Sequence, residues 1–107
     1  MQVRVLVDEY DKKSEELLEK YVKKHRKDIE WAEGFLEKCP NPPEGSLLVL
    51  EHSVEHVGHI PYVEISEELV IKSTKNSSGA ITHEVWARSY DLYRSELSET
   101  RVAEIEL

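Results

Sequence analysis

The stretch "LLVLEHSVEHVGHIP", residues 47–61, decides the fold because its apolar residues fit two different periodicities. As a strand, it would place apolar and polar side chains on both faces, so neither face suits a core. As a helix, it forms one apolar stripe and, beside it, a stripe of histidines. Gly58 stands where a C-cap glycine belongs, and Pro61 follows three residues later. The pattern therefore predicts a helix over about residues 47–58.

The chain before this stretch predicts one strand and one long helix. "QVRVLV", residues 2–7, alternates and is rich in valine, which is typical of a strand. Apolar residues then recur at spacings of three and four up to about Lys38, and His25 falls on the same stripe. A helix of this length measures about 40 Å at ~1.5 Å per residue. We therefore expect it to bend at Gly34 or to protrude and pack on a second copy of the chain.

The chain after this stretch predicts short strands, a turn and a helix. Residues 61–66 and 69–74 are β-branched runs typical of strands, and "KNSSG" at 75–79 is a turn. Residues 81–96 open like a hairpin strand, but their aromatic residues recur at helical spacing, which favours a helix. "RVAEIEL", residues 101–107, predicts a strand beside the first one. The fold class predicted is α+β: a long N-terminal helix and two shorter helices packed on a small sheet that pairs the N- and C-terminal strands.

Composition indicates a single domain spanning residues 1–107 in the cytoplasm. The chain has 22 acidic and 14 basic residues and a net charge of −8. Such a surface repels phosphate backbones and anionic membranes, so we expect neither nucleic acid nor membrane as a partner. The single cysteine, Cys39, excludes an internal disulfide and fits a reducing compartment. No apolar run reaches the ~18 residues of a membrane span.

The histidine stripe predicts a metal site. His52, Glu55 and His56 form the pattern His-x-x-Glu-His, the inverted form of a zinc-hydrolase motif. On a helix the two histidines lie one turn apart, close enough to hold one Zn²⁺ ion, and Glu55 would act as general base on a zinc-bound water. The alternative is that these are surface histidines of an amphipathic helix.

A second motif carries a resemblance to a known family. In "THEVWARSYDLYRSEL", residues 82–97, Glu84 precedes a run of aromatic residues. This resembles the glutamate helix of zincin metallopeptidases of the gluzincin, lethal-factor-like type, in which a helix with two histidines lies upstream. The resemblance implies that Glu84 is the third zinc ligand, and His59 is the alternative. The chain departs from the family's His-Glu-x-x-His, because "EHVGH" at 55–59 reverses its first two letters.

Two functions follow from these patterns. The first is a small zinc-binding protein, zincin-like, that hydrolyses a peptide or amide bond, or an inactive relative of such an enzyme. The second is a non-enzymatic acidic module that binds a protein or peptide partner and forms a homodimer through the long helix. Metal content after purification separates the two hypotheses.

Overall fold

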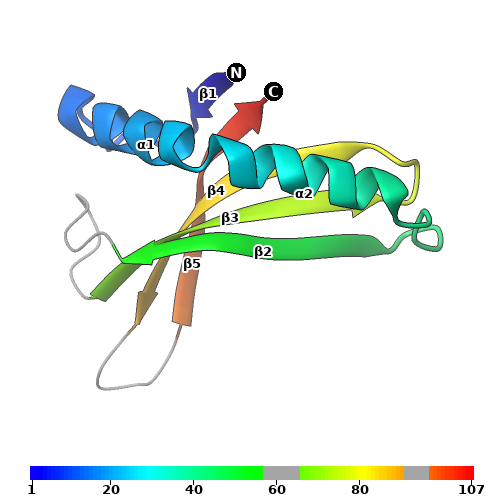
Figure 1. Cartoon of the computed structure of the whole chain (residues 1–107). Helices are drawn as coiled ribbons and strands as arrows, with labels where there is room; N and C mark the ends of the chain where they lie inside the picture. The colour runs from blue at the N-terminus through cyan, green and yellow to red at the C-terminus, as the bar shows by residue number, and fades with distance from the viewer. Residues whose placement is uncertain (57–65, 91–96) are drawn as a thin grey trace.

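The computed structural model describes residues 1–56, 66–90 and 97–107, and they form two helices on one face of a five-stranded antiparallel sheet (Figure 1). The sheet order is β1-β5-β4-β3-β2. The elements in chain order are β1 (Gln2–Val5), α1 (Lys12–Lys24), α2 (Arg26–Lys38), β2 (Leu47–His56), β3 (Ser66–Asn76), β4 (Ile81–Tyr90) and β5 (Leu97–Glu106). Pairing of β1 with β5 confirms the predicted contact between the N- and C-terminal strands.

The prediction of one long N-terminal helix was wrong, because the chain breaks at His25 into α1 and α2. His25 has φ −102° and ψ 17°, outside the helical region. The bend does not lie at Gly34, which sits inside α2. The apolar stripe continues across the break, so periodicity alone could not reveal it. Two helices at an angle can follow the twisted sheet, whereas one straight helix of about 40 Å could not.

The prediction of two shorter helices was also wrong. Residues 47–56 form β2 and residues 81–90 form β4, whereas residues 57–65 and 91–96 lie outside the described part of the chain. In β4, His83, Val85 and Ala87 are buried at a spacing of two, as a strand requires. Because β4 lies between two other strands, apolar and polar residues occur on both of its faces. The period of two that marks a strand is therefore not visible in the sequence.

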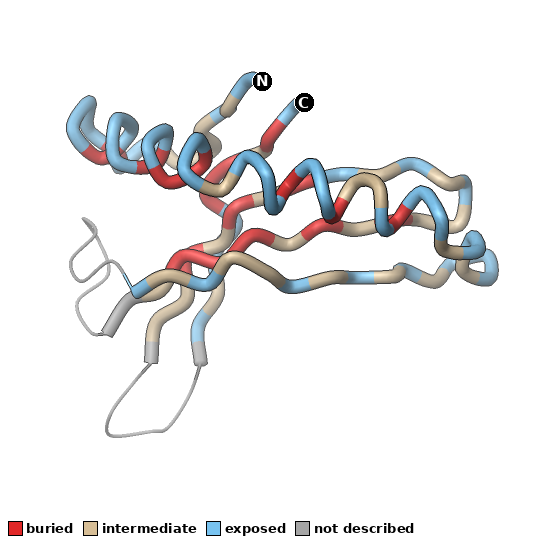
Figure 2. Tube along the Cα trace, in the orientation of Figure 1, coloured by how far each residue is buried: buried red, intermediate tan, exposed pale blue. Residues whose placement is uncertain are grey.

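The core lies between the helices and the concave face of the sheet, where Figure 2 shows the buried segments of both layers facing each other. α1 and α2 contribute the following buried apolar residues to it: Leu18, Tyr21, Val22, Ile29, Ala32 and Leu36. Lys75 of β3 is also buried, and its ammonium donates to the carbonyl oxygens of Leu36 at 3.0 Å and Cys39 at 2.6 Å. This lysine therefore caps the C-terminus of α2 and fixes it on the sheet.

The predicted turn at 75–79 is confirmed and closes the β3–β4 hairpin. The side-chain oxygen of Asn76 accepts hydrogen bonds from the backbone N–H groups of Ser78 and Ala80, both at 3.0 Å. Gly79 has φ +89°, a conformation that glycine adopts without strain. The hairpin fixes the register that places Ser73 beside His83.

None of the helices in the described ranges is long and apolar enough to cross a membrane.

Candidate functional site

A β-bulge in β2 places His52 and His56 on opposite faces of the sheet. His52 pairs with Ile71 and His56 pairs with Glu68, three residues away on β3. Successive residues of a strand face opposite sides, so partners separated by an odd number lie on opposite faces. His52 faces the helices, whereas His56 is exposed on the other face. The two histidines therefore lack the shared helix face that the metal prediction required.

Glu84 lies on the opposite face of the sheet from His52 and several residues along the strand direction from His56. It is on the face of β4 away from the helices, where it forms an ion pair with Arg101 at 2.8 Å. The residue of β4 in the same row as His56 is Arg88. Four residues, about 13 Å at ~3.3 Å per residue, separate that row from Glu84. His59, the alternative ligand, lies outside the described residues.

The predicted general base, Glu55, is held by two basic groups of the helix layer. One carboxylate oxygen accepts from the Lys24 ammonium at 2.9 Å, and the other lies 3.0 Å from Nε2 of His25. The hydrogen bond from His25, followed by that from Lys24, lowers the pKa of Glu55. A carboxylate with a lowered pKa is a weaker base. In the described part of the chain, no three His, Cys, Asp or Glu residues gather in a way that could hold a metal ion.

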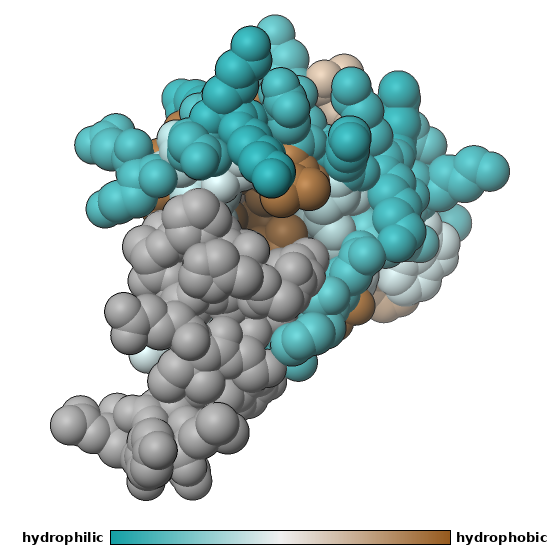
Figure 3. All heavy atoms as spheres, turned by 90° about the vertical axis from the view of Figure 1, so that its left-hand side faces the viewer, coloured by the Kyte–Doolittle hydropathy of each residue, from teal (hydrophilic) through white to brown (hydrophobic). Residues whose placement is uncertain are grey.

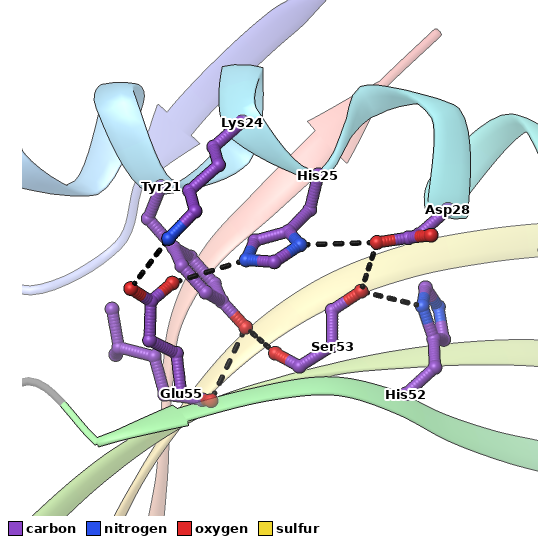
Figure 4. Close-up of polar contacts among 8 residues, drawn as sticks. Tyr21, Lys24, His25, Asp28, His52, Ser53 and Glu55 are labelled. Carbon is purple, nitrogen blue, oxygen red and sulfur yellow. Dashed lines mark hydrogen bonds and ion pairs between the residues drawn. The ribbon is translucent and has the colours of Figure 1, made fainter.

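A polar cluster joins the break between the helices to the bulge in β2 (Figure 4). Its members, called the junction cluster, are Tyr21, Lys24, His25, Asp28, Ser53 and Glu55. The imidazole of His25 lies at its centre, with Nδ1 3.0 Å from Asp28 and Nε2 3.0 Å from Glu55. Carboxylates only accept, so a ring nitrogen of His25 is the donor in each hydrogen bond that it makes with them. The hydrogen bond from His25 is the main cause that lowers the pKa of Asp28.

The junction cluster holds Ser53 in a conformation that residues other than glycine rarely adopt. Its φ is +54°, in the left-handed region, and it lies within the bulge of β2. The Tyr21 hydroxyl donates to the carbonyl of Ser53, and the carbonyl of Leu69 lies 3.2 Å from the same hydroxyl. The Ser53 hydroxyl donates to Asp28 at 3.2 Å. Strain of this kind persists only where surrounding contacts determine it, as these do.

Burial keeps the Tyr21 hydroxyl neutral. It raises the pKa of Tyr21, and the negative charges of Glu55 and Asp28 add to that effect. The phenol therefore retains its proton and acts as a donor to the bulge. The junction cluster thus fixes the angle between α1 and α2 and the bulge in β2 at the same time.

A second line of polar groups, called the buried chain, runs from α2 across the concave face of the sheet. Its members are Glu33, His83, Ser73 and His52. The Ser73 hydroxyl lies 2.6 Å from Nδ1 of His83 and 2.8 Å from Nε2 of His52. Nε2 of His83 lies 2.5 Å from the Glu33 carboxylate. Glu33 of α2 is thereby connected to His52 on β2, across β4 and β3.

The carboxylate at one end sets the direction of the hydrogen bonds in the buried chain. Because the Glu33 carboxylate only accepts, Nε2 of His83 donates to it, and in the tautomer with its proton on Nε2 the Nδ1 atom accepts from the Ser73 hydroxyl. The oxygen of Ser73 then accepts from Nε2 of His52. Both nitrogens of His83 and Nε2 of His52 have partners in the chain, and Nδ1 of His52 lies 3.2 Å from the oxygen of Ser53. Such partners reduce the penalty for burying polar groups.

The carboxylate, imidazole and hydroxyl in sequence resemble a nucleophile with its base, but the geometry does not support that chemistry. Ser73 has no exposed surface, so no substrate reaches its oxygen. A catalytic nucleophile must contact the group it attacks. The buried chain is therefore a structural connection between α2 and the sheet.

The outer face of the sheet is covered by ion pairs. Glu99 accepts from the Lys72 ammonium at 2.6 Å and from the Arg88 guanidinium at 2.7 Å. Glu51 lies 3.1 Å from Arg88 and 3.6 Å from Lys72. Lys72 also lies 4.4 Å from the ring centroid of Trp86, a cation–π contact. The negative charges of Glu99 and Glu51 on this face are therefore balanced by basic side chains, including at Glu51 on the edge strand.

A pocket at the β1 end of the sheet reaches Glu33 and His83. It is also lined by Arg4 and Arg101. Each arginine is paired with a glutamate, Arg4 with Glu104 and Arg101 with Glu84. The pocket therefore offers no uncompensated positive charge to an anionic ligand among its described residues.

Four exposed apolar residues lie close together along β2 and on the neighbouring side of α2, whereas Leu17 and Leu107 are exposed elsewhere. The exposed fractions are 63% for Leu47, 48% for Val49, 59% for Trp31 and 45% for Phe35. The rings of Trp31 and Phe35 stack, with centroids 5.3 Å apart. By contrast, hydrophilic side chains cover most of the α1 end of the molecule (Figure 3).

Helix geometry places the aromatic pair beside β2. Trp31 and Phe35 follow Asp28 by three and seven residues, a spacing that repeats on one side of a helix. Asp28 bonds to Ser53 of β2, so this side of α2 faces the edge strand. Glu33 projects from the other side toward β4.

Sequence patterns identified only part of this arrangement. His25 was noted on the apolar stripe, and His83 carries a signal as one of three buried residues at a spacing of two. Asp28 and Ser53 carry none, because their roles depend on the pairing of a helix with a distant strand. Neither family models, curated proteins nor solved structures gave a match to this chain.

Proposed function

We propose that this chain is a non-enzymatic, cytoplasmic protein-interaction module that binds an extended segment of a partner along β2. The observation that carries the proposal is the free edge of β2. β2 is the last strand of the sheet and pairs only with β3 among the described strands. An edge strand presents a row of N–H and C=O groups to which a further strand can bind.

The two edges of the sheet differ in length. β1, at the opposite edge, has four residues, whereas β2 has ten. Short edge strands are one way in which proteins prevent pairing with other chains. Of the two edges formed by the described strands, β2 is the one with a ladder long enough to give a stable contact with an extended segment.

The first half of β2 lacks the features that block such pairing. Residues 46–50, "SLLVL", contain no charge and no proline, and the bulge begins only after His52. Charges, prolines and bulges are the usual protections of an edge. The aromatic pair of α2 adds apolar surface on the side of the ladder that faces the helices.

An enzymatic function has no comparable support in the described residues. Zinc binding and metal-assisted hydrolysis stay predictions from the sequence. They are tested by metal analysis of protein purified without a histidine tag, with His52→Ala as control. Zinc at one ion per chain that is lost in the variant would support them.

The proposed function is tested with random twelve-residue peptides displayed on phage and selected against the immobilised protein. We expect the selected peptides to alternate apolar and polar residues and to change the fluorescence of Trp31. Binding should be lost in Val49→Lys, because a lysine on the edge disfavours pairing. Val54→Lys is the matched control, since Val54 lies on the same strand with a similar exposed fraction of 54% but within the bulge, outside the regular first half of the ladder. Equal binding to both variants would refute the proposal.

A further inference from the structure

Resting on the proposed function, we infer that the strand bound at β2 is the β2 strand of a second copy of this chain. The two strands pair antiparallel about a two-fold axis beside Val49, which joins two five-stranded sheets into one. The inference follows from the symmetry of the edge, the position of the aromatic pair and the distribution of charge.

Symmetry makes the edge complementary to itself. A two-fold axis beside Val49 sets Val49 opposite its own copy, and Leu48 opposite Leu50. Directly opposed residues of an antiparallel pair lie on the same face. Leu48 and Leu50 face the helices, because their partners Lys75 and Ser73 lie on the concave face of β3. The helices of both copies therefore lie on the same side of the joined sheet.

This register brings the two aromatic pairs together. Trp31 and Phe35 lie on the side of α2 that faces β2, and both α2 helices lie above the same face across the axis. Their stacked rings, exposed in one copy, are then covered by those of the other copy. Leu47 and Val49 become covered on the opposite face. A symmetric contact of this kind closes at two copies.

Charge permits the contact despite a net charge of −8 per chain. Residues 46–50 carry none, and the first carboxylate in the ladder, Glu51, is already paired with Arg88 and Lys72. In the proposed register Glu51 stands opposite Leu47 of the second copy, so no two carboxylates face each other in the ladder. The remaining repulsion acts between charged groups of the two copies that are farther apart, and salt screens this repulsion. Higher salt is therefore expected to strengthen the dimer.

The area is sufficient for a specific but moderate contact. Given that an aromatic side chain buries ~150–250 Å², the exposed parts of Trp31, Phe35, Leu47 and Val49 amount to roughly 400 Å² per copy. Two copies cover about 800 Å² of side chain, and the paired backbones extend the total beyond the ~1,000 Å² of a specific interface. We expect dissociation at micromolar concentrations rather than a permanent dimer.

Sedimentation equilibrium over a concentration series tests the inference. The wild-type chain should approach twice its monomer mass at high concentration. Val49→Lys should remain monomeric, and Trp31→Ser with Phe35→Ser should weaken association at least tenfold. Val54→Lys and Leu17→Ser are matched controls, because both residues are exposed but lie outside the proposed contact. Circular dichroism confirms that each variant is folded.

The outcomes separate this inference from the proposed function. A wild-type chain that stays monomeric at every concentration, or a Val49→Lys variant that still dimerises, overturns the pairing of β2 with its own copy. If the wild-type protein is monomeric but binds selected peptides, and the Val49→Lys variant does not bind them, the proposed strand binding is supported and self-pairing is refuted. If neither peptides nor a second copy bind at β2, both the proposed function and the self-pairing of β2 are refuted.

Discussion

Substitution of Ser73 by alanine tests the buried chain with the smallest change in shape. Ser73 is fully buried on β3 and connects His83 to His52 through its hydroxyl. Alanine removes only that oxygen and leaves no charge unbalanced. Both imidazoles then lose a hydrogen-bond partner at a position, Ser73, that has no exposed surface.

The cost follows from the two groups left without partners. A buried donor or acceptor without a partner costs about 1–3 kcal/mol. His83 is buried and His52 is half-buried, so we expect a loss of about 2–4 kcal/mol in the free energy of unfolding. For a chain of this size, ~4 °C per kcal/mol converts this into a fall of about 8–16 °C in Tm.

Urea denaturation and thermal melting at pH 8 measure this loss, with Ser98→Ala as the control. Ser98 is an exposed serine of β5, and its substitution should change the free energy of unfolding by no more than about 0.5 kcal/mol. A loss below about 1 kcal/mol for Ser73→Ala would mean that the two imidazoles have other partners and that the buried chain does not stabilise the fold.

Two further predictions concern the same interior. Burial is the main cause that lowers the pKa of His52. The unfolded chain, with an ordinary histidine pKa of about 6.5, therefore binds more protons than the folded one, so stability is full above that pH and is lost as the pH falls below it. Urea denaturation of the wild-type chain at pH 8 and pH 5.5 should show this loss of stability. The loss should be smaller in His52→Gln but unchanged in His56→Gln. An equal loss in the wild type and both variants would contradict the assignment of the pH dependence to His52. Tyr21→Phe removes the donor to the bulge at Ser53 and should cost about 1–3 kcal/mol, whereas an unchanged Tm would show that the bulge does not depend on that hydroxyl.

The strands at the two ends of the chain were predictable because residues 2–5 and 103–106 alternate and one face of the sheet is buried. The helix predicted at 47–58 failed for a specific reason. The bulge inserts one residue after His52, so the alternation of β2 changes phase in the middle of the strand. A phase change of one residue mimics a helical spacing over a short window. Ser53, which carries the bulge, is a residue type with no particular signal for a positive φ.

The break between α1 and α2 escaped prediction for a related reason. His25 is an ordinary residue for a helix, and the apolar stripe is continuous on both sides of it. The break depends on contacts with Asp28 and with Glu55, thirty residues away on β2. Periodicity reports which face of an element is buried, but such contacts between distant segments are set by tertiary packing. The long helix through which a homodimer was predicted is therefore not formed, and the proposed contact lies at the edge of β2 instead.

Disulfide formation at position 49 tests the central claim most directly. In a Cys39→Ser background, Val49→Cys places one thiol beside the proposed axis. Opposed residues of an antiparallel pair have Cα atoms about 4.5–5.5 Å apart, within the range of ~4.4–6.8 Å that a disulfide spans. Val54→Cys is the control, because the same register separates its two copies by about 33 Å at ~3.3 Å per residue.

Mild oxidation followed by non-reducing electrophoresis gives the result. The account predicts that the Val49→Cys chain is converted to a covalent dimer and that the Val54→Cys chain stays monomeric under the same conditions. A Val49→Cys chain that remains monomeric, or equal cross-linking at both positions, would contradict pairing of β2 with its own copy.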